Sequence, residues 1–148
     1  MDLKSRLNTD MKEALKAGDR IRLSTIRLVL SEIKNAEIEK RGELTEDELL
    51  GVLSKEARKR REAIEEFERG GRKDLVFKES EELKILKGYM PRQLSDEEIR
   101  KVIREAIEET GASSPRDLGK VMGVVMPKVR GKVDGKVVNR IAAELLEG

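Results

Sequence analysis

The sequence predicts an all-α fold, with a four-helix domain over residues 1–92 and a three-helix domain over residues 93–148. Aromatic residues make up 2% of the chain and Trp is absent, so the core must be built from aliphatic side chains, which suit helix packing better than sheet sandwiches. Charged residues make up 42% and nearly cancel, leaving a net charge of +2, as in helices rich in intrahelical ion pairs. Apolar residues recur at helical spacing, and no segment alternates with the period of two that a strand requires.

Apolar stripes mark the first two predicted helices. The first is expected to end near Gly18, because apolar residues recur every four positions at Leu3, Leu7, Met11 and Leu15. Asp19 suits the N-cap of a second helix, which should run to about Lys40 with Gly42 as its C-terminal punctuation. The second helix is apolar enough that we expect it at the centre of its bundle.

Two more helices complete the N-terminal domain. Thr45 and Glu48 form a capping box at the start of the third helix, which should run to Gly70-Gly71. The fourth helix is expected over about residues 73–88. Pro91 then breaks the chain direction, so the domain boundary belongs there.

An arginine interrupts the apolar stripe of the third helix, where Arg60 or Arg61 stands between Ala57 and Ile64. We expect its aliphatic stem to lie across the bundle while the guanidinium reaches solvent. The alternative is that residues 58–61 form an anion-binding patch, although the glutamates that follow favour local neutralisation.

The three helices of the C-terminal domain also have local start and stop signals. A second capping box begins at Ser95, and its helix should close at Gly111. Ser114-Pro115 combines an N-cap with Pro at the first helical position and should start the next helix, which Pro127 either ends or tightens into an irregular last turn. Asp134 should cap the final helix.

Positive charge is concentrated in residues 111–140. Seven basic residues stand there against Asp117 and Asp134, so the segment carries a net charge of +5 and the rest of the chain −3. This asymmetry favours a polyanionic partner, and a solvated lysine-rich helix face is the alternative. The candidate RNA-binding residues are Lys120, Lys128, Arg130, Lys132, Lys136 and Arg140.

Four glycines accompany these cations. Gly119 and Gly123 stand inside a predicted helix, where each costs roughly 1 kcal/mol relative to Ala, so something should compensate. Close helix crossing is one explanation, and close approach of a nucleic-acid backbone is the other. Gly131 and Gly135 lie beside lysines at a helix N-terminus, where backbone N–H groups and the helix dipole favour phosphate.

The composition argues against several kinds of site. Cys and His are absent, which removes the thiol nucleophile, the commonest general base and the commonest metal ligand. No phosphate-binding glycine loop is present, so we expect no catalytic residues, no metal and no cofactor. No apolar run approaches the roughly 20 residues of a membrane span, and the N-terminus lacks the apolar core of a signal peptide. These features predict a cytoplasmic protein without a membrane partner.

Three motifs carry a resemblance to a known family: residues 117–123 (DLGKVMG), 126–132 (MPKVRGK) and 134–139 (DGKVVN). They closely resemble the YqeY family of small bacterial proteins, as do residues 22–27 (RLSTIR), 34–39 (KNAEIE) and 58–62 (RKRRE) of the N-terminal part. Residues 94–148 are also similar to the tail domain of the GatB subunit of tRNA-dependent amidotransferases.

The resemblance implies an all-α fold with a three-helix tail and, through GatB, a tail that contacts tRNA. It also implies a carbon–nitrogen ligase assignment with glutamine as amido-N donor, for which the residues of this chain offer no site. We therefore expect a non-catalytic adaptor that binds tRNA or another structured RNA through its C-terminal domain. A protein-interaction module and an amidotransferase accessory are the alternatives, and the N-terminal bundle is the expected dock for a protein partner.

Overall fold

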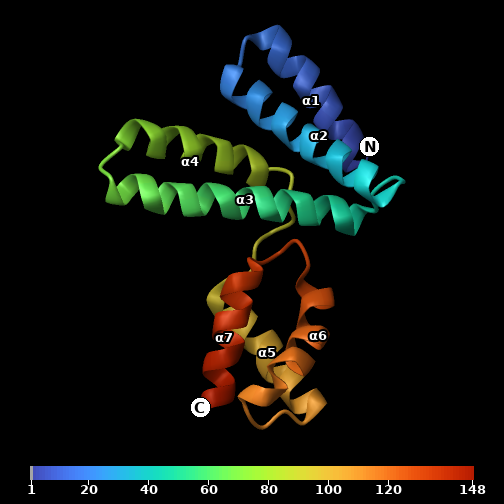
Figure 1. Cartoon of the computed structure of the whole chain (residues 1–148), viewed down its shortest axis with the longest axis vertical. Helices are drawn as coiled ribbons and strands as arrows, with labels where there is room; N and C mark the ends of the chain where they lie inside the picture. The colour runs from blue at the N-terminus through green and yellow to red at the C-terminus, as the bar shows by residue number, and fades with distance from the viewer. Residues whose placement is uncertain (1) are drawn as a thin grey trace. The chain divides into compact units, whose positions relative to one another are not determined.

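The computed structural model describes residues 2–148, and this part of the chain is helical without a strand, which confirms the all-α prediction. The chain divides into two compact units, one ending at Pro91 and one covering Arg92–Gly148 (Figure 1). The first unit contains α1 (Leu3–Ala17), α2 (Arg20–Lys40), α3 (Glu46–Arg69) and α4 (Lys73–Lys87). The second contains α5 (Asp96–Thr110), a 3₁₀ turn (Pro115–Asp117), α6 (Leu118–Val129) and α7 (Gly135–Glu147).

The N-terminal unit is built from two antiparallel hairpins, α1–α2 and α3–α4 (Figure 1). Gly18 closes α1 in the left-handed region at φ 71°, where only glycine sits without a steric cost. The Asp19 carboxylate then accepts from the backbone N–H of Arg22 at 3.1 Å, as its predicted N-cap role requires. At the other end of α2 the left-handed position is Arg41 and not the neighbouring Gly42.

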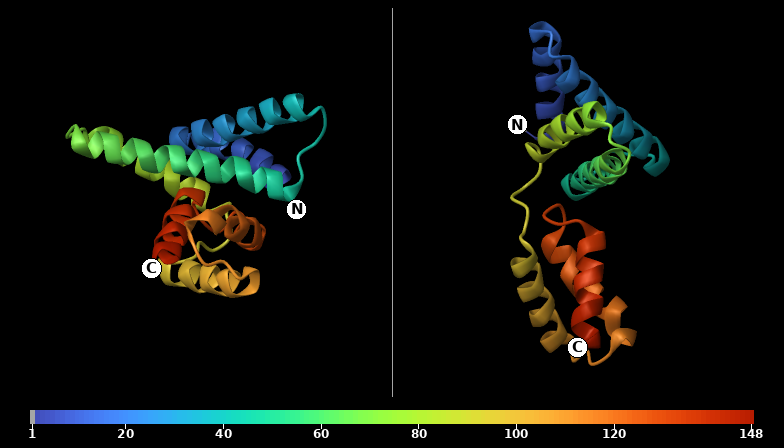
Figure 2. Two further views of the ribbon diagram at one scale, coloured as in Figure 1. Left: turned by 60° about the horizontal axis from the view of Figure 1, so that its bottom comes forward. Right: turned by 90° about the vertical axis from the view of Figure 1, so that its left-hand side faces the viewer.

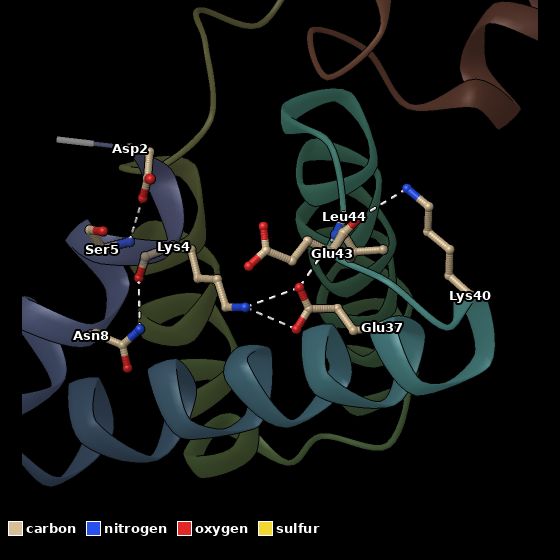
Figure 3. Close-up of polar contacts among 8 residues, drawn as sticks. All are labelled: Asp2, Lys4, Ser5, Asn8, Glu37, Lys40, Glu43 and Leu44. Carbon is tan, nitrogen blue, oxygen red and sulfur yellow. Dashed lines mark hydrogen bonds and ion pairs between the residues drawn. The ribbon is translucent and has the colours of Figure 1, made fainter.

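A polar cluster ties the start of α1 to the α2–α3 connection (Figure 3). Lys4 Nζ donates to both carboxylate oxygens of Glu37, at 2.9 and 3.0 Å. Glu37 Oε2 also accepts from the backbone N–H of Leu44 at 3.3 Å. The hydrogen bond from Lys4 lowers the pKa of Glu37 below its ordinary value. Thr45 and Glu48 then form the predicted capping box of α3.

The core of the N-terminal unit is aliphatic, apart from Tyr89. Its largest fully buried apolar side chains include Leu7, Ile26, Ile33, Leu53 and Leu86. The buried Tyr89 hydroxyl donates to Asp10 Oδ2, and the Arg6 guanidinium lies 5.1 Å from the Tyr89 ring centroid. Burial, followed by the hydrogen bond to Asp10, raises the pKa of Tyr89 to about 12.

Contrary to the prediction, the Arg60 guanidinium does not reach solvent. It is 6% exposed and lies between two buried glutamates, Glu56 and Glu82. Arg60 Nη1 lies 3.3 Å from Glu56 Oε2, and Arg60 Nε lies 3.5 Å from Glu82 Oε2. Desolvation, with the charge of Glu82 next, raises the pKa of the neighbouring Glu79. The arginine therefore links α3 to α4 through an internal ion cluster, because a guanidinium buried without partners would be very costly.

In the C-terminal unit α7 lies against both α5 and α6 (Figure 2). The predicted capping box at Ser95 and the left-handed Gly111 are both present. Ser114 makes no side-chain capping bond, and Pro115 opens a 3₁₀ turn before α6 begins. The helix continues through Pro127 to Val129.

The core of this unit is made of small branched and aliphatic side chains from all three helices. The fully buried members include Ile103, Val121, Val125, Val138 and Ile141. No aromatic residue contributes, since Phe67, Phe77 and Tyr89 all precede residue 92. Packing of α6 against α7 fixes the connection between them, where most of the candidate cations lie.

Candidate nucleic-acid interface

The α6–α7 connection, residues 130–134, is held by backbone geometry and by the start of its own unit. Gly131 is buried and adopts φ 79°, in the left-handed region, so a side chain there would be strained. Gln93 Nε2 donates to the Gly131 carbonyl at 2.9 Å, and the Leu94 N–H donates to the Lys132 carbonyl at 2.8 Å. These bonds leave the side chains of Arg130 and Lys132 exposed on a fixed backbone.

Four of the six predicted RNA-binding residues gather around this connection. Lys128 is in the last turn of α6, Arg130 and Lys132 are in the connection, and Lys136 is in the first turn of α7. All four are exposed. Arg140 follows one helical turn after Lys136 on the same exposed side of α7.

Lys120 lies apart from this group. It is exposed on α6, eight positions before Lys128, which corresponds to roughly 12 Å along a helix axis. Its nearest charged neighbour in sequence is Asp117, whose carboxylate accepts from the Ser113 N–H at 2.9 Å. That backbone hydrogen bond, with the charge of Lys120 as a smaller contribution, lowers the pKa of Asp117.

The candidate cations differ in how far they are neutralised. Lys128 Nζ lies 3.3 Å from Glu109 Oε2, and both side chains are more than half exposed, so this pair is weak and separable. Arg130, Lys132 and Arg140 have no ion pair among the residues that the structure describes. These three are therefore the most available positive charges of the group.

The N-terminus of α7 is already capped by the protein. Asp134 Oδ1 accepts from the Lys136 N–H at 3.0 Å, and the Asp134 carbonyl accepts from the N–H groups of Val137 and Val138. The Asp134 carboxylate thus occupies the position in which a phosphate would meet the helix dipole. An anion at this end of the unit would have to be held mainly by side chains.

Gly119 and Gly123 face open space. A Cβ built at either position meets no atom within 4 Å among the described residues, so close helix crossing within the unit does not explain them. At Gly135 a Cβ would make ordinary contact with Met126 Cε at 3.8 Å. Gly119 and Gly123 are consequently two exposed positions of α6 without a side chain, and Lys120 follows the first of them.

Charge is segregated within the C-terminal unit. Helix α5 carries six acidic and three basic residues, whereas residues 111–140 carry the excess of positive charge. Sequence reasoning did not single out one exposed cation of this segment, Arg116, which is the middle residue of the 3₁₀ turn before α6. It was counted in the basic segment, but no helical spacing singled it out. No helix in residues 2–148 is long and apolar enough to cross a membrane.

Comparison with known proteins identifies the family. The sequence profile of the Yqey-like protein family matches residues 4–146. The chain belongs to this family. The resemblance seen in its sequence motifs is thereby confirmed for the YqeY family, and the chain is a YqeY-family helical protein.

Curated relatives share substantial identity with the chain. Three of these relatives have the name "Altered inheritance of mitochondria protein 41, mitochondrial". The protein from Lachancea thermotolerans is 37% identical over 118 residues, which is 78% of this chain and 63% of the relative. Those from Kluyveromyces lactis and Vanderwaltozyma polyspora are 45% and 32% identical over 56% and 76% of this chain. The chain spans 63%, 45% and 64% of the length of these three relatives.

The names of these relatives correct two expectations. The predicted cytoplasmic location and bacterial association are contradicted, because the matching curated proteins are mitochondrial proteins of yeasts. Both expectations rest on composition, on the N-terminal segment and on the resemblance to a family of bacterial proteins. Neither amino-acid composition nor helix pattern specifies a cellular compartment.

Proposed function

We propose that this YqeY-family chain is a non-catalytic adaptor that binds structured RNA, with tRNA as the expected ligand, through its C-terminal unit. One observation carries the proposal: Arg130, Lys132 and Arg140 are exposed, lie near one another in sequence at the α6–α7 connection and the start of α7, and have no ion pair among the described residues. In a chain where many cations have carboxylate partners, unpaired clustered charges favour a polyanion. The similarity of residues 94–148 to the GatB tail supports the same ligand.

Recognition in this proposal is by backbone and shape. The C-terminal unit has no aromatic residue, so stacking of unpaired bases, which single-strand-binding proteins use, is not available. Cationic side chains instead contact phosphates, as expected for folded RNA with A-form helices. Affinity should then decrease steeply as salt rises, because each contact releases counterions.

The two exposed glycines of α6 support a close approach by the RNA. Gly119 and Gly123 leave space above the helix, and Lys120 lies beside them. A phosphate chain can approach such a surface more closely than one covered by side chains. Close approach of RNA would explain why glycine stands at these two positions, which helix packing within the unit does not explain.

The proposal is tested by fluorescence anisotropy of labelled tRNA over a series of salt concentrations. The test variant combines Lys132→Ala with Arg140→Ala. The matched control combines Lys101→Ala with Arg104→Ala, which removes one exposed lysine and one exposed arginine from the acidic helix α5. We expect the test variant to bind at least about tenfold more weakly and its salt slope to fall by about two. Equal affinities for the two variants would rule the C-terminal contact out.

A second candidate function is the docking of a protein partner by the N-terminal unit, and one surface pocket of that unit favours it. It measures about 560 Å³ at the tip of the α3–α4 hairpin and is lined by Phe67, Val76 and Phe77 among others. Phe77 is 63% exposed, and both phenylalanines of the chain line this pocket. If a protein partner binds here, Phe77→Ser should abolish its capture in lysates treated with RNase while leaving tRNA binding unchanged.

An amidotransferase accessory role remains a separate proposal with its own test. It requires that the chain change the rate of ammonia transfer to charged tRNA by the other subunits. If the rate of ammonia transfer is unchanged at a saturating concentration of this chain, the accessory role is ruled out.

A further inference from the structure

The solvent-facing side of α2 carries a row of basic and hydroxyl side chains. Arg20, Ser24, Arg27, Ser31 and Lys34 follow one another at spacings of four, three, four and three residues. This spacing places them on one line along a helix of 3.6 residues per turn. All five are exposed, and the opposite side of α2 supplies its buried residues. We call these five residues the basic row.

The three cations of the basic row have no partner in the part of the chain that the structure describes. Arg20, Arg27 and Lys34 have no ion pair or hydrogen bond among the described residues. No acidic residue occurs between Asp19 and Glu32, although acidic residues number 30 in the chain. The charge of this helix face is therefore positive and uncompensated over most of its length.

Other cations of the same helix are paired with carboxylates. Arg22 Nη2 lies 3.4 Å from Asp10 Oδ2, and Lys40 Nζ lies 2.6 Å from Glu48 Oε1. Carboxylates are thus supplied on the sides of α2 that face α1 and α3. Within α2, the cations without a carboxylate partner among the described residues are those of the basic row.

The serines open space between the long cationic side chains. Serine is a weaker helix former than Ala, Lys or Glu, so helix stability does not explain two of them on one exposed line. Ser24 Oγ donates to the Ile21 carbonyl at 3.2 Å and keeps its acceptor capacity. A hollow of about 410 Å³ lies over this face, lined by Arg20, Leu23, Ser24, Arg27, Leu28 and Ser31.

The chemistry of the basic row fits a phosphodiester backbone. Successive cations are roughly 10 Å apart along the helix, and the whole row spans roughly 21 Å. Regular positive charge over this length complements a ligand with regularly spaced negative charge. Arg, Lys and Ser are side chains that contact phosphate and sugar in nucleic-acid complexes. The row contains no aromatic anchor of the kind that dominates protein–protein interfaces.

We propose that the basic row of α2 binds the sugar–phosphate backbone of RNA, so that the N-terminal unit has an RNA contact of its own. This goes beyond the function proposed above, which concerns the C-terminal unit alone. The contact on α2 can exist whether or not the α6–α7 connection binds RNA. Each contact therefore has its own variant in the test.

The experiment measures tRNA affinity of the full chain against salt concentration. The test variant carries Arg20→Ala, Arg27→Ala and Lys34→Ala. Alanine at exposed helix positions preserves the helix, and circular dichroism with thermal unfolding verifies the fold. The control carries Lys12→Ala, Lys55→Ala and Lys73→Ala, three exposed lysines of the same unit that have no ion pair among the described residues. Both variants lose the same amount of charge.

We expect the basic-row variant to bind tRNA about tenfold or more weakly than the control, with a salt slope lower by two to three. Equal affinity and equal slope in the two variants overturn the proposal. The proposal is upheld if the basic-row variant loses tRNA binding while the Lys132→Ala, Arg140→Ala variant keeps it in full. That result would also rule out the C-terminal contact. The reverse pattern overturns only the contact on α2. Vesicles of phosphatidylserine serve as the second probe: if the basic-row variant loses vesicle binding but keeps tRNA binding, the RNA assignment is wrong.

Discussion

Arg60 Nη1 lies 3.3 Å from Glu56 Oε2, one turn earlier on α3, and both side chains are buried. Glu82 of α4 approaches the same guanidinium at 3.5 Å. A charge that is desolvated in this way depends on its partners, because removal of one leaves the others uncompensated in a low-dielectric interior. The α3–α4 hairpin is therefore joined by electrostatics at a point where the apolar stripe is interrupted.

Substitution of Arg60 should destabilise the N-terminal unit strongly. Arg60→Ala leaves Glu82 buried without its cation and leaves Glu56 with only the more exposed Lys59, at 3.4 Å. We therefore expect the free energy of unfolding to fall by about 3–5 kcal/mol. Arg69→Ala is the control, because Arg69 is exposed and pairs only with exposed glutamates; its effect should stay within about 1 kcal/mol. Urea unfolding measures both. Similar losses for the two variants would contradict a buried ion cluster.

The stability of the C-terminal unit should depend on Glu98 at acid pH. Hydrogen bonds from Arg92 and then from the Ser95 N–H lower the pKa of Glu98 from 4.5 to about 2. The folded pKa is below the unfolded one, so this stabilisation is present above pH 4.5 and is lost as pH falls toward about 2. Glu98→Gln should flatten the loss of stability across that window, measured by thermal unfolding. Glu105→Gln, on the exposed side of the same helix, is the control variant, because it removes a carboxylate outside the capping box.

The single tyrosine provides a direct optical titration. The chain has one Tyr and no Trp, so tyrosinate absorbance reports on Tyr89 alone. Tyr89 should ionise with a pKa of about 12 in the folded protein. Its folded pKa exceeds the ordinary 10.0, so its contribution to stability is complete below pH 10 and decreases as pH rises toward 12. Asp10→Asn should move the titration to lower pH, and an unchanged midpoint would show that Asp10 has no influence.

Glycines in the C-terminal unit should respond to alanine in opposite ways. At Gly123 a Cβ meets nothing within 4 Å, so Gly123→Ala should raise the free energy of unfolding by up to about 1 kcal/mol. At Gly131, with φ 79°, alanine should lower it by about 1–2 kcal/mol. Denaturant unfolding of the two variants measures both changes in the free energy of unfolding. If RNA approaches the α6 backbone, Gly123→Ala should also weaken tRNA binding while the protein becomes more stable.

Local signals in the sequence predicted most helix boundaries. The capping residues Asp19, Thr45, Ser95 and Asp134 act through neighbours within three positions, so their roles follow from the sequence alone. Ser114 is the exception, since its side chain makes no capping bond and the segment begins as a 3₁₀ turn.

Features that depend on tertiary neighbours were not predictable in the same way. The burial of Arg60 requires Glu82 from another helix, and no pattern within α3 reveals that pairing. The open space above Gly119 and Gly123 likewise depends on which side of α6 meets α5 and α7. Spacing identified the candidate cations, but only the structure separates Lys128, which has a carboxylate partner, from Arg130 and Lys132.

The most direct test of RNA binding by the C-terminal unit is an amide chemical-shift map of the isotopically labelled full chain during titration with a tRNA stem–loop. We predict the largest salt-sensitive shifts at residues 128–140 and at the amides of Gly119 and Gly123, with α5 little affected. Additional shifts along α2 would accompany them if the basic row binds as well. A map in which residues 118–140 do not respond at low salt would contradict the account.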